Sequence, residues 1–246
     1  YMPDNSLKRN INYELDHKIW QYPDWRNYEI KYRPDIWWNS YDGIKYGVHA
    51  NGSYMKHHHI LDLNFWINSA ILQEDFDKRE EHDKFSFRAY YKHNLDLLTK
   101  NSSFSIYSSM LDGLATNEIN LLNKSRNEKF QVNIKLKSLY RNNPNVFNYL
   151  IHEDWAYGLF NNRIDINFTK FYSGDHSGNG LLSVELMNSG FLSDYDYTKL
   201  IFTATNNRKL NKLIFRSRAF FQFGNGSNWA PESKLYLSGS NLENMM

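Results

Sequence analysis

The sequence predicts an all-β protein, an antiparallel up-and-down meander, and two observations lead to this prediction. The first is a period of two. Leu61, Leu63, Phe65 and Ile67 alternate with polar residues, as in a strand with one apolar and one polar face. The second is turn chemistry, because Asp42-Gly43 separates two such segments and glycine accepts the positive φ that tight turns require.

The alternation recurs along the chain from Tyr28 onward. We count about ten such segments, with no long stretch of helical period between them. The expected strands lie at 28–38, 44–54, 61–67, 85–92, 103–106, 131–137, 163–169, 182–187, 200–204 and 212–222. Polar stretches between them are predicted to be loops, at 73–83, 117–127, 141–154 and 173–180.

Residues 1–27 are polar and irregular, with Pro3 and Pro23 as breakers. We interpret them as a connector from an upstream domain into a β region at 28–246, although residues 1–10 also fit an ordinary frayed terminus. The first residue is not Met and no signal peptide is visible. This indicates a processed chain or an excerpt from a longer one.

Composition excludes several classes of protein. The chain of 246 residues has 17% aromatic residues, a net charge of +2 and no cysteine, and its mean hydropathy is −0.70. The charge argues against a dedicated nucleic-acid binder, which needs a concentrated basic surface. Without cysteine, neither a disulfide framework nor a thiolate metal site can form. No apolar run is long enough for a transmembrane helix.

Two architectures bury an alternating face of this kind. A soluble β-sandwich or lipocalin-like barrel turns its apolar face inward, whereas a transmembrane barrel turns it to lipid and keeps a polar lumen. Four features favour the transmembrane barrel: strands near the 9–11 residues that cross a bilayer, alternating short and long connections, mid-strand charges, and aromatic residues near strand ends. The charges are Arg88, Lys135, Asp165, Glu185, Arg216 and Arg218. The aromatic residues are Tyr32, Trp37, Trp38, Tyr41, Tyr54, Tyr140, Trp155 and Tyr172.

This architecture predicts which way each side chain faces. Lipid-facing residues are expected to be Leu61, Leu63, Phe65, Ile67, Val132, Ile134, Leu136, Ile164, Ile166 and Phe168. Lumen-facing residues are expected to be Asp62, Asn64, Lys135, Asp165, Arg216 and Arg218. The lumen charges either line a conduit or pair with one another and fill the interior.

Two groups of residues invite a metal or catalytic interpretation. His152-Glu153 begins like HExxH, in which two His one helical turn apart bind zinc and the Glu is the general base. Asp154 to Ala156 follow, however, so no second His stands at the required spacing. His57 to His59 would alternate between the two faces of a strand, so that at most two of them share a metal, with Asp62 on the opposite face.

No nucleophile elbow is present, and the glycines of 173–180 match no phosphate-binding loop. We therefore assign no catalytic and no metal-binding residue to this sequence, and its binding residues are unassigned. An aromatic surface formed by Trp37, Trp38 or Trp66 is the basis of an alternative, a soluble β-domain that binds carbohydrate.

One stretch resembles a known family. The run from Arg33 to Ile71, with WWNSYDGIKYG as its most specific part, looks like the barrel-entry segment of large Bacteroidota outer-membrane proteins. In these, an M1-like (gluzincin) metallopeptidase domain precedes a BamA-like surface-antigen barrel. Pro23 to Trp25 and the terminal KLYLSGSNLENMM (Lys234 to Met246) resemble segments of the same family. Members continue past the last segment, so the resemblance implies a fragment whose barrel is partial at its C-terminal side.

The resemblance implies a function without chemistry in this segment: a non-catalytic outer-membrane β-barrel that anchors an M1-like zinc metallopeptidase. Zinc and hydrolysis would belong to the missing upstream domain. The expected partners are outer-membrane lipid and that domain, with no nucleic acid. An assembly or translocation barrel of the BamA type is a second hypothesis. A partial barrel would leave unpaired strand edges near Tyr28–Trp38 and Lys212–Phe223, so the chain alone is expected to be inert and topologically incomplete.

Overall fold

The protein is all-β in the computed structural model, which describes residues 11–16, 26–39, 42–54, 58–72, 84–95, 101–111, 113–141, 158–174, 178–190, 192–210 and 213–234. Twelve strands follow one another in a single sheet whose strand order is the order of the sequence. They are β1 (Ile11–Leu15), β2 (Tyr28–Asn39), β3 (Gly43–Tyr54), β4 (His58–Asn68), β5 (Phe85–Leu95), β6 (Ser102–Leu111), β7 (Leu114–Lys124), β8 (Phe130–Arg141), β9 (Phe160–Gly174), β10 (Gly178–Ser189), β11 (Asp196–Leu210) and β12 (Leu213–Asn228). A 3-10 helix, η3 (Pro231–Ser233), follows β12.

The predicted all-β meander is therefore confirmed. The described strand order has two ends, β1 and β12, and no described pairing joins them. None of the described residues belongs to a helix long and apolar enough to cross a membrane.

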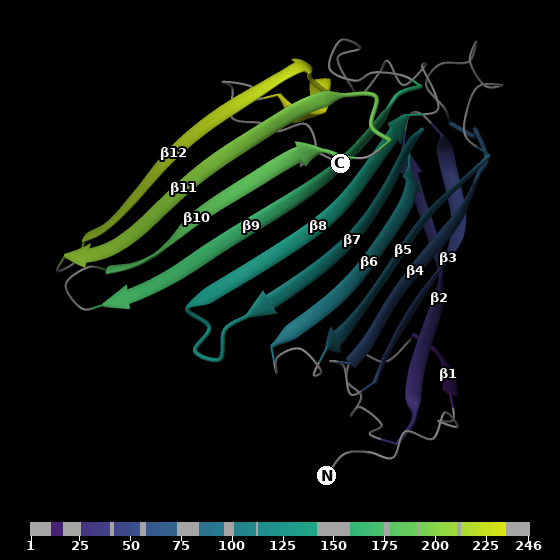
Figure 1. Ribbon diagram of the computed structural model, residues 1–246. Helices are drawn as coiled ribbons and strands as arrows, with labels where there is room; N and C mark the ends of the chain where they lie inside the picture. Colours follow the sequence, from purple (N-terminus) through teal and green to yellow (C-terminus); the bar gives the residue numbers. More distant parts are fainter. Residues whose placement is uncertain are drawn as a thin grey trace. The chain divides into compact units, whose positions relative to one another are not determined.

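The chain divides into two compact units. The first holds β1 to β5 and residues 105–111 of β6, and the second holds residues 102–104 of β6 and all of β7 to β12. In the first unit β1 pairs with β2 in parallel, and β2 to β5 are antiparallel neighbours. In the second unit β7 to β12 are antiparallel neighbours, and their long strands run side by side in Figure 1.

The predicted turn at Asp42-Gly43 begins β3. Gly43 has a φ of +71°, and a Cβ at this position would collide with the backbone carbonyl oxygen of Ile71. Glycine is therefore required here both by the backbone conformation and by the close approach of a second chain segment.

Two strands lie outside the predicted set. β1 falls inside the predicted connector 1–27, and β7 occupies most of the predicted loop 117–127, so both of these predictions are wrong there. In β7 the alternation is hard to read because Asn117 and Asn123 stand on the apolar face, on either side of Ile119 and Leu121.

Two further boundaries differ from the prediction. β9 ends at Gly174 and β10 begins at Gly178, so the predicted loop 173–180 is only a short connection. The expected free edge at Tyr28–Trp38 is paired over Tyr28 to Tyr32, where β1 adds as a parallel strand. The loop 73–83 and residues 142–154 of the loop 141–154 lie outside the described residues.

Candidate functional site

The two faces of the sheet differ in chemistry and in exposure, and the usual relation is inverted. In β4 of the first unit Phe65 is 50% exposed, whereas Asn64 next to it is 6% exposed. In β9 of the second unit Phe168 is 54% exposed and Asp165 is 4% exposed. In soluble proteins the apolar side chains are the buried ones. In these two strands the polar side chains are the more buried ones, and the apolar side chains are the more exposed ones.

The register of the second unit aligns the exposed and half-buried apolar residues of this face in rows. Leu121, Ile134, Ile166 and Leu186 form one row across β7 to β10. We call the set of such rows the apolar band, made up of Ile119, Leu121, Val132, Ile134, Leu136, Ile164, Ile166, Phe168, Leu182, Val184, Leu186, Leu200, Phe202 and Phe221.

The predicted division between two faces agrees with this register. In β8 and β9, Val132, Ile134, Leu136, Ile164, Ile166 and Phe168 share the apolar face, whereas Lys135 and Asp165 pair on the polar one. Arg216 and Arg218 of β12 also lie on the polar face. In the first unit the residues at 61, 63, 65 and 67 share one face, and Asp62 and Asn64 lie on the other.

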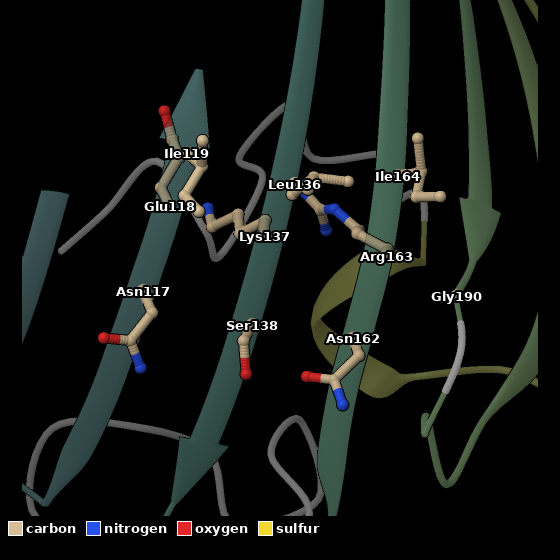
Figure 2. Close-up of a pocket in the computed structure, with 10 residues that line it drawn as sticks. All are labelled: Asn117, Glu118, Ile119, Leu136, Lys137, Ser138, Asn162, Arg163, Ile164 and Gly190. Carbon is tan, nitrogen blue, oxygen red and sulfur yellow. The ribbon is translucent and has the colours of Figure 1, made fainter. Parts of the chain in front are cut away.

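The apolar band ends in a polar border. Asn117, Ser138 and Asn162 lie at one level on β7, β8 and β9, next to the last apolar row, as Figure 2 shows. Together with Gly190 they line a shallow depression of about 320 Å³. The Asn162 side chain donates a hydrogen bond to the Leu192 carbonyl (2.6 Å). This bond joins the polar border to the connection between β10 and β11.

Aromatic rings stand at both ends of the band. Beyond the polar border the rings of Tyr140 and Phe160 stack with centroids 4.3 Å apart, and Phe130 marks the other end, with the Lys170 ammonium 5.7 Å from its centroid. The ten-residue spacing from Phe130 to Tyr140 covers about 33 Å along a strand. At the tilt of about 45° that spanning strands adopt, this corresponds to about 23 Å, close to the roughly 25 Å apolar band of outer-membrane barrels.

The polar face of the first unit contains a buried ionic cluster. Lys45 and Asp42 form an ion pair in which both side chains are fully buried. The Lys45 ammonium lies 4.4 Å from the centroid of Trp37, which meets Trp66 edge-on at 5.6 Å. The Trp66 indole nitrogen donates to Asp35 (2.9 Å). We call these five residues the Lys45 cluster.

A second group on the same face surrounds Asp62. One carboxylate oxygen contacts His49 Nε2 at 3.2 Å, and the other accepts hydrogen bonds from Asn64 (2.7 Å) and Arg88 Nη2 (3.3 Å). The mid-strand charges Asp62 and Arg88 are therefore paired across β4 and β5. This arrangement fits a polar interior in which charges neutralise one another.

The polar face of the second unit is organised by the segment that follows β12. Trp229 stacks on Tyr197 with centroids 5.1 Å apart, and Ser233 lies among Asn161, Arg163 and Tyr197. Its hydroxyl is 3.3 Å from Asn161 Nδ2, 3.2 Å from Arg163 Nη1 and 2.9 Å from the Tyr197 hydroxyl. The Lys199 ammonium donates to the Ser233 carbonyl (2.8 Å). We call Trp229–Ser233 the folded-back segment.

Two ion pairs lie on the same face. Arg163 and Asp165 form a buried ion pair at 3.1 Å, and Lys135 pairs with Glu118 at 3.4 Å. Both pairs lie on the polar face: Arg163 and Asp165 are two residues apart on β9, whereas Lys135 and Glu118 join β8 to β7. The Lys135–Glu118 pair joins β7 to β8, and the contacts of Ser233 join the folded-back segment to β9 and β11.

The structure describes only part of the sequence-predicted metal and catalytic candidates. His152, Glu153 and His57 lie outside the described residues. His59 has a φ of +49°, its ring nitrogen is 2.8 Å from the Tyr91 hydroxyl, and its ring stacks on His93 at 4.1 Å. No cluster of three or more potential metal ligands occurs among the residues the structure describes.

The three tryptophans of the carbohydrate hypothesis do not form one surface. Trp37 and Trp66 belong to the buried Lys45 cluster. Trp38 lies on the apolar face, where its indole nitrogen donates to the Leu72 carbonyl (3.0 Å). A sugar-binding platform needs rings that share an open face, and these rings are divided between two faces.

Zinc is expected to leave the thermal stability of the chain unchanged. The His59 ring contacts the Tyr91 hydroxyl and stacks on His93, and His152-Glu153 has no second His at zinc-peptidase spacing. The measurement is the midpoint of thermal unfolding with zinc and with a chelator. A stoichiometric zinc ion in purified protein, or a zinc-dependent rise in the midpoint, would contradict this expectation.

The comparisons with known proteins add no relative. No protein-family model matches the sequence, and no curated protein matches it.

The folded-back segment is the element that sequence reasoning missed. Its one local signal is Pro231, which starts a 3-10 turn; the partners of Ser233 are up to 72 residues away in the sequence.

Replacing Ser233 with Ala is expected to release the folded-back segment. The change removes the hydroxyl that meets Asn161, Arg163 and Tyr197, and leaving buried polar groups unsatisfied costs about 1–3 kcal/mol. Hydrogen exchange of the backbone amides at 229–234 measures the release. The matched control is Ser227→Ala, because the Ser227 hydroxyl contacts the exposed Asp196 (2.9 Å). Equal exchange in the two variants would show that Ser233 does not hold the segment.

Proposed function

We propose that this chain is a non-catalytic segment of an outer-membrane β-barrel, with the apolar band in lipid and the polar face towards the lumen. One observation carries the proposal: in β4 and β9 large apolar side chains are exposed, whereas polar and charged side chains such as Asn64, Arg163 and Asp165 are buried. An apolar patch of this extent on a soluble monomer would promote association. In a bilayer the same patch faces the hydrocarbon of the lipids, in which apolar side chains are stable.

Three further features support the proposal. Aromatic rings stand beyond both ends of the apolar band, the spacing of these rings along β8 fits the apolar layer of outer-membrane barrels, and the polar face carries ion pairs. Strands in a bilayer must also have their backbone groups paired within a sheet, which a continuous meander provides for every strand between its two edges.

Single cysteines test the proposal, because the chain has no cysteine of its own. We would place one at Val132, Ile134 or Leu136 on the apolar face, and one at Asn133 or Lys135 on the polar face. Each is labelled with an environment-sensitive fluorophore after insertion into phosphatidylcholine vesicles. The three apolar-face labels are expected to be quenched by doxyl lipid, and the polar-face labels by aqueous iodide.

Ser138 is the matched control, since it lies on the same strand and face but at the polar border. Its label is expected to respond to both quenchers. A fluorophore that is quenched by iodide at every position of β8 would exclude membrane insertion. Doxyl quenching with no period of two would exclude a strand that has one face in lipid.

The role we propose for the barrel rests on the resemblance of Arg33–Ile71. It is to anchor an M1-like zinc metallopeptidase domain in the outer membrane, with hydrolysis carried out by that separate domain. Reading the parent gene tests this role: an HExxH motif encoded upstream of Tyr1 is expected. If the upstream region lacks it, an assembly or translocation barrel of the BamA type becomes the better proposal.

A further inference from the structure

Cations gather at one end of the apolar band in the second unit. Lys170 and Arg208 both lie on the apolar face, where the register places them opposite Phe130 and Phe215. Both side chains are exposed. The Lys170 ammonium is within 5.7 Å of the Phe130 ring, so its apolar stem follows an aromatic surface before the charge reaches solvent.

The neighbouring strand ends add more positive charge. The antiparallel register brings the β7–β8 turn, the end of β9 and the end of β11 to the same end of the sheet. The cations there that lie in the β7–β8 turn or on the apolar face, which we call the basic end, are Arg126, Lys129, Lys170 and Arg208. Among the described residues of these strand ends, Glu128 is the single acid.

The opposite end of the band has a different chemistry. Its border on the apolar face consists of the uncharged Asn117, Ser138 and Asn162 (Figure 2). Asp194 lies in the adjoining β10–β11 connection, and Asp196 begins β11. The sequence from Tyr197 to Pro231 contains no Asp or Glu, although it includes most of β11 and all of β12. On the apolar face of the described strands, positive charge is therefore concentrated at one end of the band, because Lys137 and Arg163 near the other end lie on the polar face.

We propose that the basic end binds the phosphate groups of anionic lipids in the leaflet that it touches. The inference rests on the proposed membrane function and adds a lipid class and an orientation to it. The cations stand where the apolar band stops, which is the depth of the headgroups once the band is in hydrocarbon. Lys and Arg near a membrane surface are attracted to anionic lipid, and each strengthens binding about fivefold.

Two charge-matched double variants test the lipid contact. K170Q/R208Q removes two cations from the apolar face at the basic end. R216Q/R218Q removes two exposed cations from the polar face of β12. Binding of the full chain is measured by flotation with phosphatidylcholine vesicles and with vesicles of equal parts phosphatidylcholine and phosphatidylglycerol, at low and high salt.

The unaltered chain is expected to prefer the anionic vesicles, and salt should weaken that preference. K170Q/R208Q is expected to lose roughly tenfold or more in affinity for anionic vesicles and to bind neutral vesicles as before. R216Q/R218Q should stay within about twofold of the unaltered chain, because its cations are on the face away from lipid.

Each other outcome has a definite meaning. Equal binding of the unaltered chain to neutral and anionic vesicles would overturn the lipid contact and leave the proposed barrel standing. Binding to neither would overturn both. If K170Q/R208Q lost affinity for soluble polyglutamate but not for anionic vesicles, the basic end would belong to an acidic protein partner, and the lipid contact would be wrong.

Discussion

Replacing Ile134 with Arg is expected to destabilise the protein in a bilayer by about 2–4 kcal/mol, the cost of a cation near the midplane of an outer-membrane barrel. Ile134 is in the middle row of the apolar band, between Leu121 and Ile166. It is 39% exposed, so the same substitution in a soluble protein would expose a charge to water at little cost. The size of the effect therefore distinguishes lipid from water at this face.

Ser138→Arg is the control for depth. Ser138 is on the same strand and the same face, at the polar border of the band, where an Arg costs about 0–1 kcal/mol. The measurement is the free energy of unfolding by urea in phosphatidylcholine vesicles. Equal costs at Ile134 and Ser138 would contradict the proposed position of the band, and no cost at Ile134 would contradict its contact with lipid.

The faces of the strands were predictable because alternation is a local property. Leu63, Phe65 and Ile67 show by their spacing alone that they share a face of β4, and the register adds only their cross-strand neighbours. The strand predictions failed where the alternation of apolar and polar residues is weak or short. β7 has two of its apolar-face positions filled by Asn, and β1 is a five-residue strand whose parallel partner lies beyond a long connection.

The polar clusters could not be predicted in the same way. Ser233 meets Arg163 across 70 residues of sequence, and no periodicity indicates that the chain after β12 turns onto β9 and β11. The sequence around Lys45 is typical of an exposed lysine near a turn, yet the side chain of Lys45 is fully buried. The burial of the Lys45 side chain depends on Trp37, Trp66 and Ser86, which belong to three other strands.

Breaking the Asp42–Lys45 pair is expected to have the largest effect of any single substitution proposed for the first unit. Both side chains are fully buried, and the Lys45 ammonium also donates to Ser86 (3.2 Å). Asp42→Asn keeps the size of the side chain but leaves the ammonium buried without its counter-ion. Removing one partner of a buried ion pair costs about 3–5 kcal/mol.

A double-mutant cycle separates the ion pair from the packing around it. Lys45→Met keeps most of the apolar stem against Trp37 and removes the charge, so it leaves Asp42 as the uncompensated partner. The double variant Asp42→Asn, Lys45→Met has no buried charge, and replacing a whole buried pair is often close to neutral. Its cost is therefore expected to be smaller than that of either single variant, measured as the free energy of urea unfolding. If the two single costs simply add in the double variant, the charges do not interact and the Lys45 cluster is held by its aromatic contacts alone.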